Sequence, residues 1–189
     1  MDYLGRNIFC LEGDWEDDMR KKTSILPGLE MLHSISDVEF MYKTCGTEEE
    51  LLYRLKDYVR YRKSKYKYYN ILYLATHGNK GTMYYGDSLN VLDFFKNNFN
   101  EGDLEDKIIH FGSCATMQMR EEDWIEFKNF TGAKIISGYL KNVDFLESTL
   151  FDILYFRALQ YRKAIKPLND ALFKEYEGMY KGLGFIMKY

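Results

Sequence analysis

The chain has 189 residues, a length that suits one domain of ordinary to large size. Hydrophobic residues make up 46% and charged residues 29%, close to globular averages, which excludes a disordered tail or a fibrous chain. The net charge of −3 disfavours a general nucleic-acid binder, and every apolar run is shorter than the roughly 18–20 residues of a membrane span.

The first part of the chain alternates short apolar runs with segments whose apolar residues recur at helical spacing. Thr47 followed by Glu48, Glu49 and Glu50 forms a capping box with acids in the first turn, and this marks the start of a helix. In chain order we expect a strand at residues 7–11, a helix at 27–36, a strand at 38–44, a helix from 47 to about 65, and a strand at 71–75.

The second part continues this alternation, and because the whole chain contains only 2 prolines, long regular elements are expected. After a glycine-rich, hairpin-like stretch at 81–86 we expect a helix that is capped by Asp87 or Ser88 and runs through Phe99. The remaining expected elements are a strand at 107–111, a helix ending at Gly132, a strand at 133–137, a long buried helix at 145–161, a helix after Pro167, and a terminal strand at 184–189.

The order of these elements predicts the fold class. The central strands are continuous apolar runs, which is typical of strands buried on both faces of a parallel sheet. Strands that alternate with helices favour an α/β fold with helices on both faces. We therefore expect a three-layer α/β/α sandwich with a mostly parallel sheet of about six strands. Since no linker or internal repeat is visible, we expect a single domain over residues 1–189.

Unusual residues follow three of the predicted strands. The acidic run 12–18 follows the first strand, His77 and Gly78 follow the third, and Ser113 and Cys114 follow the fourth. Open parallel sheets place their sites at the carboxyl ends of the strands. If the third and fourth strands are neighbours, His77 and Cys114 face each other across one crevice.

A histidine and a cysteine in this position suit nucleophilic catalysis by a thiol. A thiolate is the nucleophile, and a nearby imidazole accepts the thiol proton or stabilises the thiolate. Gly78 allows the backbone to approach a substrate carbonyl, and the amides of Gly78 and Cys114 would then form an oxyanion hole. The alternative is structural: a lone cysteine is usually a small buried hydrophobe, and a lone histidine at a strand end is usually a hydrogen-bonded loop residue.

Three segments in this part of the chain resemble one family. Leu-Ala-Thr-His-Gly at 74–78 and Ile-Ile-His-Phe-Gly-Ser-Cys-Ala-Thr at 108–116 resemble the His-Gly and Cys signatures of caspase-fold (clan CD) cysteine peptidases, with the CHAT type the most similar. Residues 130–139 resemble the Gly-Ala strand of that group. The resemblance covers about residues 70–160; before that, only the order of strands and helices matches.

The resemblance implies a fold and a reaction. With the predicted strands numbered in chain order, it implies the sheet order 2-1-3-4-5-6 with the terminal strand as an antiparallel edge. It implies a hydrolase, a cysteine endopeptidase that cleaves a protein or peptide substrate with Cys114 as nucleophile and His77 as base, without cofactor or metal. Ser113 stands where Ala is common in the family. We expect no sensor or repeat domain beside the predicted peptidase, so its control would lie in a regulatory protein partner, in self-cleavage, or in nothing.

The substrate pocket is expected beside the predicted dyad. In the resembled fold the loop after the first strand shapes this pocket, so Asp14 is a candidate, and Ser137 and Tyr139 would form an uncharged wall. An uncharged wall favours an apolar substrate side chain before the scissile bond, and the acidic loop makes a basic one the second choice. Aspartate is disfavoured because five acids precede Arg20.

The acidic run and two other features have competing interpretations. Residues 12–18 carry enough carboxylates for a divalent metal, but they lack the spacing of a calcium loop, and a solvated loop is the favoured interpretation. His110 shares its strand with Cys114, and a mid-strand histidine in an apolar run is typically a satisfied core residue. Residues 53–69 mix Lys and Arg with Tyr, which suits either a solvated helix face or a binding surface.

The second function class follows from that mixed segment. A catalytically inactive caspase-like adaptor would use the basic, tyrosine-rich helix at 53–69 to bind an acidic partner or RNA, with nucleic acid the less expected of the two.

The cysteines and the N-terminal residues indicate the cellular compartment of the protein. Three widely spaced cysteines do not form a disulfide framework, and the N-terminal residues lack the pattern of a signal peptide. We therefore expect a cytoplasmic protein with no membrane partner.

Overall fold

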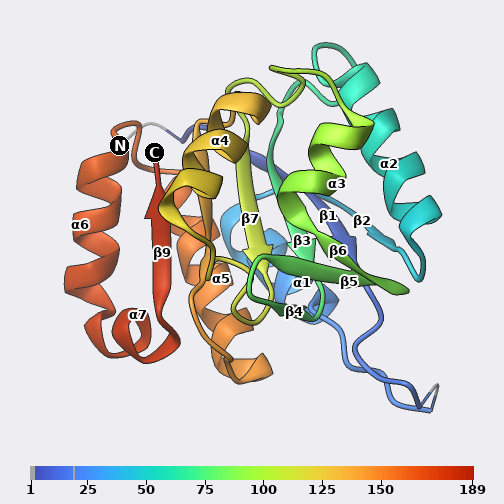
Figure 1. Cartoon of the computed structure of the whole chain (residues 1–189). Helices are drawn as coiled ribbons and strands as arrows, with labels where there is room; N and C mark the ends of the chain where they lie inside the picture. The colour runs from blue at the N-terminus through green and yellow to red at the C-terminus, as the bar shows by residue number, and fades with distance from the viewer. Residues whose placement is uncertain (1–2, 19) are drawn as a thin grey trace.

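A six-stranded sheet forms the centre of the computed structural model, which describes residues 3–18 and 20–189 (Figure 1). The strand order is β2-β1-β3-β7-β8-β9; five strands are parallel, and β9 runs antiparallel to β8. The strands are β1 (Asn7–Glu12), β2 (Phe40–Thr44), β3 (Tyr69–Ala75), β7 (Ile108–Gly112), β8 (Ile135–Tyr139) and β9 (Phe185–Lys188). The expected sheet order and the antiparallel terminal edge are confirmed.

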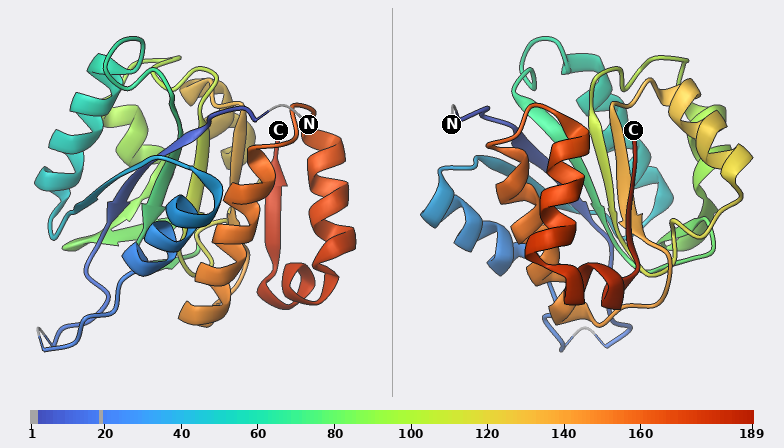
Figure 2. Two further views of the ribbon diagram at one scale, coloured as in Figure 1. Left: turned by 180° about the vertical axis from the view of Figure 1, so that it is seen from behind. Right: turned by 90° about the vertical axis from the view of Figure 1, so that its left-hand side faces the viewer.

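Helices cover both faces of this sheet, so the predicted three-layer α/β/α sandwich is confirmed (Figure 2). In β1, Phe9 and Leu11 face one helical layer, whereas Ile8 and Cys10 face the other. The sequence of this strand is continuously apolar because helices cover both of its faces. On the first face lie α2 (Glu48–Tyr61), α3 (Val91–Asn98) and α4 (Glu121–Thr131); on the second lie α1 (Leu26–Ser36), α5 (Phe145–Leu159), α6 (Ile165–Glu175) and α7 (Glu177–Leu183).

A small antiparallel sheet follows β3 and corrects one expectation. It contains β4 (Gly78–Asn79), β5 (Thr82–Tyr85) and β6 (Asp87–Asn90). Asp87 and Ser88 therefore do not cap a helix. Instead, Leu89, whose side chain is buried, lies opposite Met83 in the ladder between β6 and β5. Helix α3 begins at Val91, and the side chain of Asn90 caps it by accepting a hydrogen bond from the Asp93 amide.

The C-terminal segment contains two helices where the sequence predicted one. The helix around Pro167 ends at Tyr176, whose backbone is not helical, and α7 begins at the next residue. The ring of Tyr176 packs edge-on against Phe151 of α5, so tertiary contact accompanies the break although no proline or glycine marks it. Within the described part of the chain, no helix combines the length and the apolarity needed to cross a bilayer.

Buried tyrosines make the stability of this fold sensitive to alkali. Burial raises the pKa of five fully buried phenols above the ordinary value of 10.0, namely those of Tyr58, Tyr73, Tyr85, Tyr139 and Tyr155. Between pH 10 and the raised values, the same groups ionise in the unfolded chain while they stay protonated in the folded chain.

We therefore predict that the free energy of unfolding falls steeply as the pH rises above 10. Each such tyrosine contributes a loss of up to about 1.4 kcal/mol per pH unit. Urea unfolding curves measured from about pH 8 to about pH 11, with tyrosinate absorbance recorded in parallel, test this. A denaturation midpoint that stays constant over this range would contradict the prediction.

Candidate functional site

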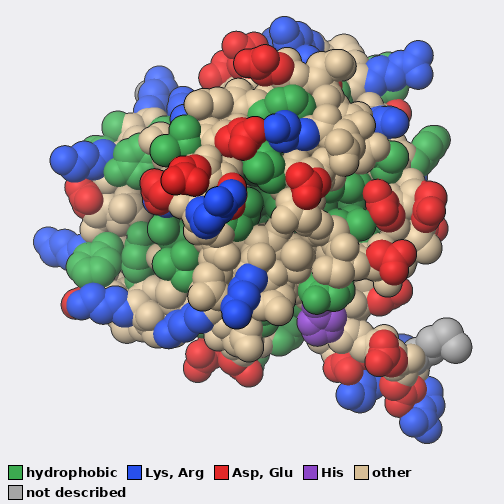
Figure 3. All heavy atoms as spheres, viewed as in Figure 1, with side chains coloured by type: hydrophobic (Ala, Val, Ile, Leu, Met, Phe, Trp, Pro, Cys, Tyr) green, Lys and Arg blue, Asp and Glu red, His purple; other side chains and the backbone are tan. Residues whose placement is uncertain are grey.

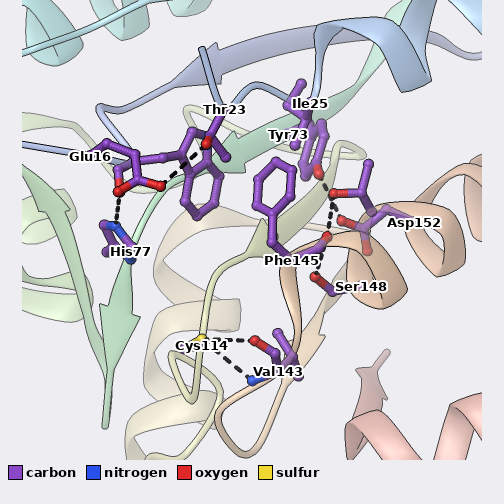
Figure 4. Close-up of a pocket in the computed structure, with 13 residues that line it drawn as sticks. Glu16, Thr23, Ile25, Tyr73, His77, Cys114, Val143, Phe145, Ser148 and Asp152 are labelled. Atoms are coloured by element: carbon purple, nitrogen blue, oxygen red, sulfur yellow. Dashed lines mark hydrogen bonds between the residues drawn. The ribbon is translucent and has the colours of Figure 1, made fainter. Parts of the chain in front are cut away.

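A cavity of about 140 Å³ lies at the carboxyl ends of the central strands (Figure 4). It brings His77 and Cys114 to one site, and its volume is close to that of an engineered cavity of about 150 Å³ that holds benzene. The cavity therefore has room for one side chain. Its lining residues are Trp15, Glu16, Thr23, Ile25, Tyr73, His77, Gly112, Cys114, Val143, Phe145, Ser148, Thr149 and Asp152.

The sheet register places the histidine and the cysteine at the same level. Strands β3 and β7 are adjacent, and their last aligned pair is Ala75 with Gly112. His77 lies two residues beyond that pair on one chain segment, and Cys114 lies two residues beyond it on the other. His77 is exposed and Cys114 is half-buried, so both can be reached from outside.

Close packing ties the two segments together. A Cβ atom on Gly78 would lie 2.9 Å from the Cys114 carbonyl oxygen and 2.9 Å from the Ser113 Cβ, so only glycine fits here. Thr116 donates a 2.8 Å hydrogen bond from its hydroxyl to the Thr82 carbonyl of β5, which fixes the cysteine loop to the small sheet. The chain turns sharply after the cysteine, where the backbone is left-handed with φ 48° at Ala115.

A backbone carbonyl orients the imidazole of His77. Its Nε2 lies 2.7 Å from the Trp15 carbonyl oxygen. The imidazole ring of His77 and the indole ring of Trp15 also pack edge to face, with their centroids 5.2 Å apart. Because a carbonyl only accepts hydrogen bonds, Nε2 must carry the proton. In the neutral ring, Nδ1 is then the basic nitrogen.

The sulfur of Cys114 is held by the loop that precedes α5. The Val143 amide donates a 3.4 Å hydrogen bond to Sγ, which also lies 3.7 Å from the Val143 carbonyl oxygen (Figure 4). These two contacts with the Val143 backbone fix the position of the sulfur at the cavity.

Glu12 is a buried residue that the sequence did not distinguish from the acids after it. It ends β1, and its carboxylate accepts hydrogen bonds from Trp15 Nε1 at 2.5 Å and from the Ile25 amide at 2.7 Å. The hydroxyls of Ser24, at 2.6 Å, and Tyr42 also donate to it. Glu12 therefore closes the loop between β1 and α1 and positions Trp15, whose carbonyl holds His77.

The rest of the acidic run is solvated, as the sequence predicted. Asp18 pairs with Arg20 at 2.8 Å, and Lys21 lies 3.0 Å from Glu16 and lowers the pKa of that carboxyl. Figure 3 shows acidic and basic side chains together on this projecting loop, at the lower right of the view. Among the residues that the structure describes, no three acidic, histidine or cysteine side chains are grouped as metal ligands.

The three predicted pocket residues do not line the cavity. Asp14 is exposed and approaches Gly46, on the outer side of the loop. Ser137 and Tyr139 are fully buried, because alternate side chains of β8 point into the layer that contains α5. The Ser137 hydroxyl lies 2.9 Å from His110 Nδ1, and the Tyr139 hydroxyl donates to Asp152, so both support the cavity from behind.

His110 is a core histidine with both ring nitrogens hydrogen-bonded, as the sequence predicted. It is fully buried, and its Nε2 lies 2.7 Å from Asp152 Oδ1. No pattern in the sequence indicated that Asp152 belongs to the cavity, because it is one of several polar residues of α5.

The basic, tyrosine-rich segment 53–69 lies at the opposite end of the sheet, immediately before β3. Tyr58 and Tyr66 are buried, and the Tyr66 hydroxyl donates to Asp57 at 2.6 Å. Lys65 covers the Tyr66 ring with its ammonium group 4.9 Å from the ring centroid. These two rings stabilise the fold, whereas the rings of Tyr53 and Tyr68 in the same segment are exposed.

A family model matches residues 5–189, and its description is "Family of unknown function (DUF6642)". The chain belongs to the DUF6642 family. No curated protein matches the chain. All elements that line the cavity lie within the matched residues, so the site is part of the domain that defines DUF6642.

We predict that Gly78→Ala displaces the cysteine loop. The new methyl group would overlap the Cys114 carbonyl, and overpacking of this kind costs about 1–3 kcal/mol of stability. Denaturant unfolding measures that loss, and the rate of thiol alkylation reports the displacement of the cysteine. Gly178→Ala in α7 is the matched control, because no atom lies within 4 Å of its new Cβ. Equal stability of the two variants would contradict the close packing.

We also predict that iodoacetamide modifies Cys114 selectively in the folded protein. Cys10 and Cys45 are buried, and burial raises the pKa of Cys10 well above its usual value and that of Cys45 to about 11. At about pH 8, only about one Cys45 thiol in a thousand is ionised. Peptide mass spectrometry after brief labelling should find the label at Cys114 and, in urea, at all three cysteines. Equal labelling of the folded protein at Cys45 would contradict this.

Proposed function

We propose that this protein is a cysteine endopeptidase that hydrolyses peptide bonds of a protein or peptide substrate with Cys114 and His77. The observation that carries the proposal is the shared cavity, which holds a half-buried thiol and an oriented imidazole beside a space of side-chain size. A cysteine nucleophile needs a neighbouring base and a third group that orients the base. Here the Trp15 carbonyl is the orienting group.

The reaction uses the two side chains in turn. Cys114 Sγ attacks the carbonyl carbon of the scissile bond, while His77 Nδ1 holds the thiol proton. When the C–N bond breaks, the imidazolium gives this proton to the leaving amine and an acyl-thioester remains. Water then attacks the thioester carbonyl, His77 takes a proton from the water, and cleavage of the C–S bond releases the acid and regenerates the cysteine.

Backbone amides supply the oxyanion hole in this proposal. The Tyr84 amide donates to the His77 carbonyl at 3.0 Å, so the next pair, Gly78 with Met83, is a non-hydrogen-bonded pair of the β4–β5 ladder. The Gly78 amide is therefore directed away from β5. Together with the Cys114 amide it would stabilise the developing oxyanion, and each such donor is worth about 3–4 kcal/mol in comparable sites.

We propose the cytoplasm as the compartment of this peptidase. All three cysteines are free thiols, and a nucleophilic thiol stays reduced where the surroundings are reducing. A regulatory protein partner remains part of the proposal, because an exposed His77 and a half-buried Cys114 are open to substrates without a covering segment among the described residues.

We predict that Cys114→Ala and His77→Ala each abolish cleavage of a susceptible substrate, with a loss of at least about a thousandfold in kcat/KM. The nucleophile and the base act as one unit, so either loss stops the reaction. Circular dichroism should show that both variants remain folded. Cleavage of a casein or peptide library, read by mass spectrometry, measures the activity.

Two matched control variants distinguish a loss of catalysis from a loss of folding. Cys45→Ala removes a buried thiol of the core, and His33→Ala removes a surface imidazole of α1; both should cleave at the wild-type rate. Turnover that persists in Cys114→Ala would overturn the mechanism. A thiol-directed peptide probe that labels Cys114 only when His77 is present would support it.

A further inference from the structure

A buried carboxylate lies at the end of the cavity away from the loop of His77. Asp152 belongs to α5, is only 1% exposed, and lines the cavity together with Tyr73 and Ser148 (Figure 4). Burying a charged group is costly unless partners compensate it, so its contacts decide what this end of the cavity can bind.

Three protein donors engage the Asp152 carboxylate. The Tyr73 hydroxyl donates to Oδ2 at 2.7 Å, the Tyr139 hydroxyl donates to Oδ1, and His110 Nε2 lies 2.7 Å from Oδ1. A carboxylate offers about four acceptor positions. The second position of Oδ2 has no donor among the residues that the structure describes, which leaves room for a hydrogen bond from a ligand.

The charges around the cavity have one sign. Its lining residues include two acids, Glu16 and Asp152, and no lysine or arginine. Lys21 already compensates Glu16, which lies at the exposed mouth. In the described part of the chain the ion-pair partner of Asp152 is His110, 2.7 Å away, and no lysine or arginine pairs with it; the low dielectric of its surroundings strengthens the attraction of the carboxylate for a cation.

The walls of the cavity suit the aliphatic part of a long side chain. The Trp15 and Phe145 rings meet edge to face with centroids 5.0 Å apart, and Ile25 and Val143 add apolar surface. Lysine and arginine bury their methylene groups against such surface and place their charged ends at aromatic rings or carboxylates.

We propose that this cavity binds the cationic side chain of a lysine or arginine that precedes the scissile bond, and that Asp152 determines this specificity. The inference rests on the proposed peptidase function. The sequence alone favours an apolar side chain, because Ser137 and Tyr139, on the strand that follows the cysteine, are uncharged. Asp152 reverses that order, since its carboxylate lines the cavity where those two side chains do not.

Two peptides that differ only at the ammonium group test the proposal. In the Cys114→Ala background, a peptide with lysine before the scissile position is compared by calorimetry with the same peptide carrying norleucine. We expect the lysine peptide to bind roughly tenfold or more tightly, and Asp152→Asn to abolish that preference. The exposed Asp170→Asn on α6 removes the same charge away from the cavity and should retain that preference.

Three outcomes would overturn the proposal: norleucine binding as tightly as lysine, a lysine preference that survives Asp152→Asn, or binding of neither peptide. The first comparison uses no change at Asp152, so it remains decisive even if Asp152→Asn unfolds the protein. Binding is measured in Cys114→Ala, which lacks the nucleophile. If the cavity binds the lysine peptide but the wild-type protein cleaves no substrate, the proposed peptidase function is contradicted and the proposed specificity of the cavity stands.

Discussion

The buried carboxylate of Glu12 is the interaction on which the site depends. It stands at the end of β1, where a charge is costly unless it is fully hydrogen-bonded. The donors that satisfy it come from three segments: the loop after β1, the start of α1, and β2. Their convergence holds the loop against the sheet. The loop in turn delivers the Trp15 carbonyl to His77, so a core requirement fixes the orientation of a surface imidazole.

The parallel sheet brings the segments that carry His77 and Cys114 together. Adjacent parallel strands end at one edge, so the segments after β3 and β7 leave the sheet side by side. Two glycines allow this close approach: Gly78 lies against the Cys114 carbonyl, and Gly112, at the end of β7, lies against the ring of Tyr73. A larger residue would displace the backbone of the cysteine loop at the first position and the Tyr73 ring at the second.

Much of the fold follows from local sequence signals, and so does the placement of His77 and Cys114 at one cavity. Continuous apolar runs identify the buried strands, and residues at strand ends are brought together whenever the strands are neighbours. The small strand β6 was harder to predict, because Asp87 and Ser88 resemble a helix cap while Leu89 alone marks the burial that makes the segment a strand. The same competition between local signal and tertiary contact explains the break at Tyr176.

The rest of the site could not be predicted, because it depends on which side of an element a residue faces. Ser137 and Tyr139 stand near the cysteine in the fold, but the period of two along β8 points them into the core. Glu12 is one of several acids in sequence and differs only in its burial. Asp152 is one of several polar residues of a helix that is apolar on most faces, and only the packed structure shows that it lines a cavity.

The placement of the two tryptophans gives this protein an intrinsic optical probe. Trp124 is buried in the opposite layer, where its indole N–H donates to the Met117 carbonyl, whereas Trp15 lines the cavity. Replacing Trp124 by phenylalanine would leave one tryptophan in the chain, at the wall of the site. Its emission would respond to the displacement of water from the cavity, so occupancy could be followed in stopped flow without a labelled ligand.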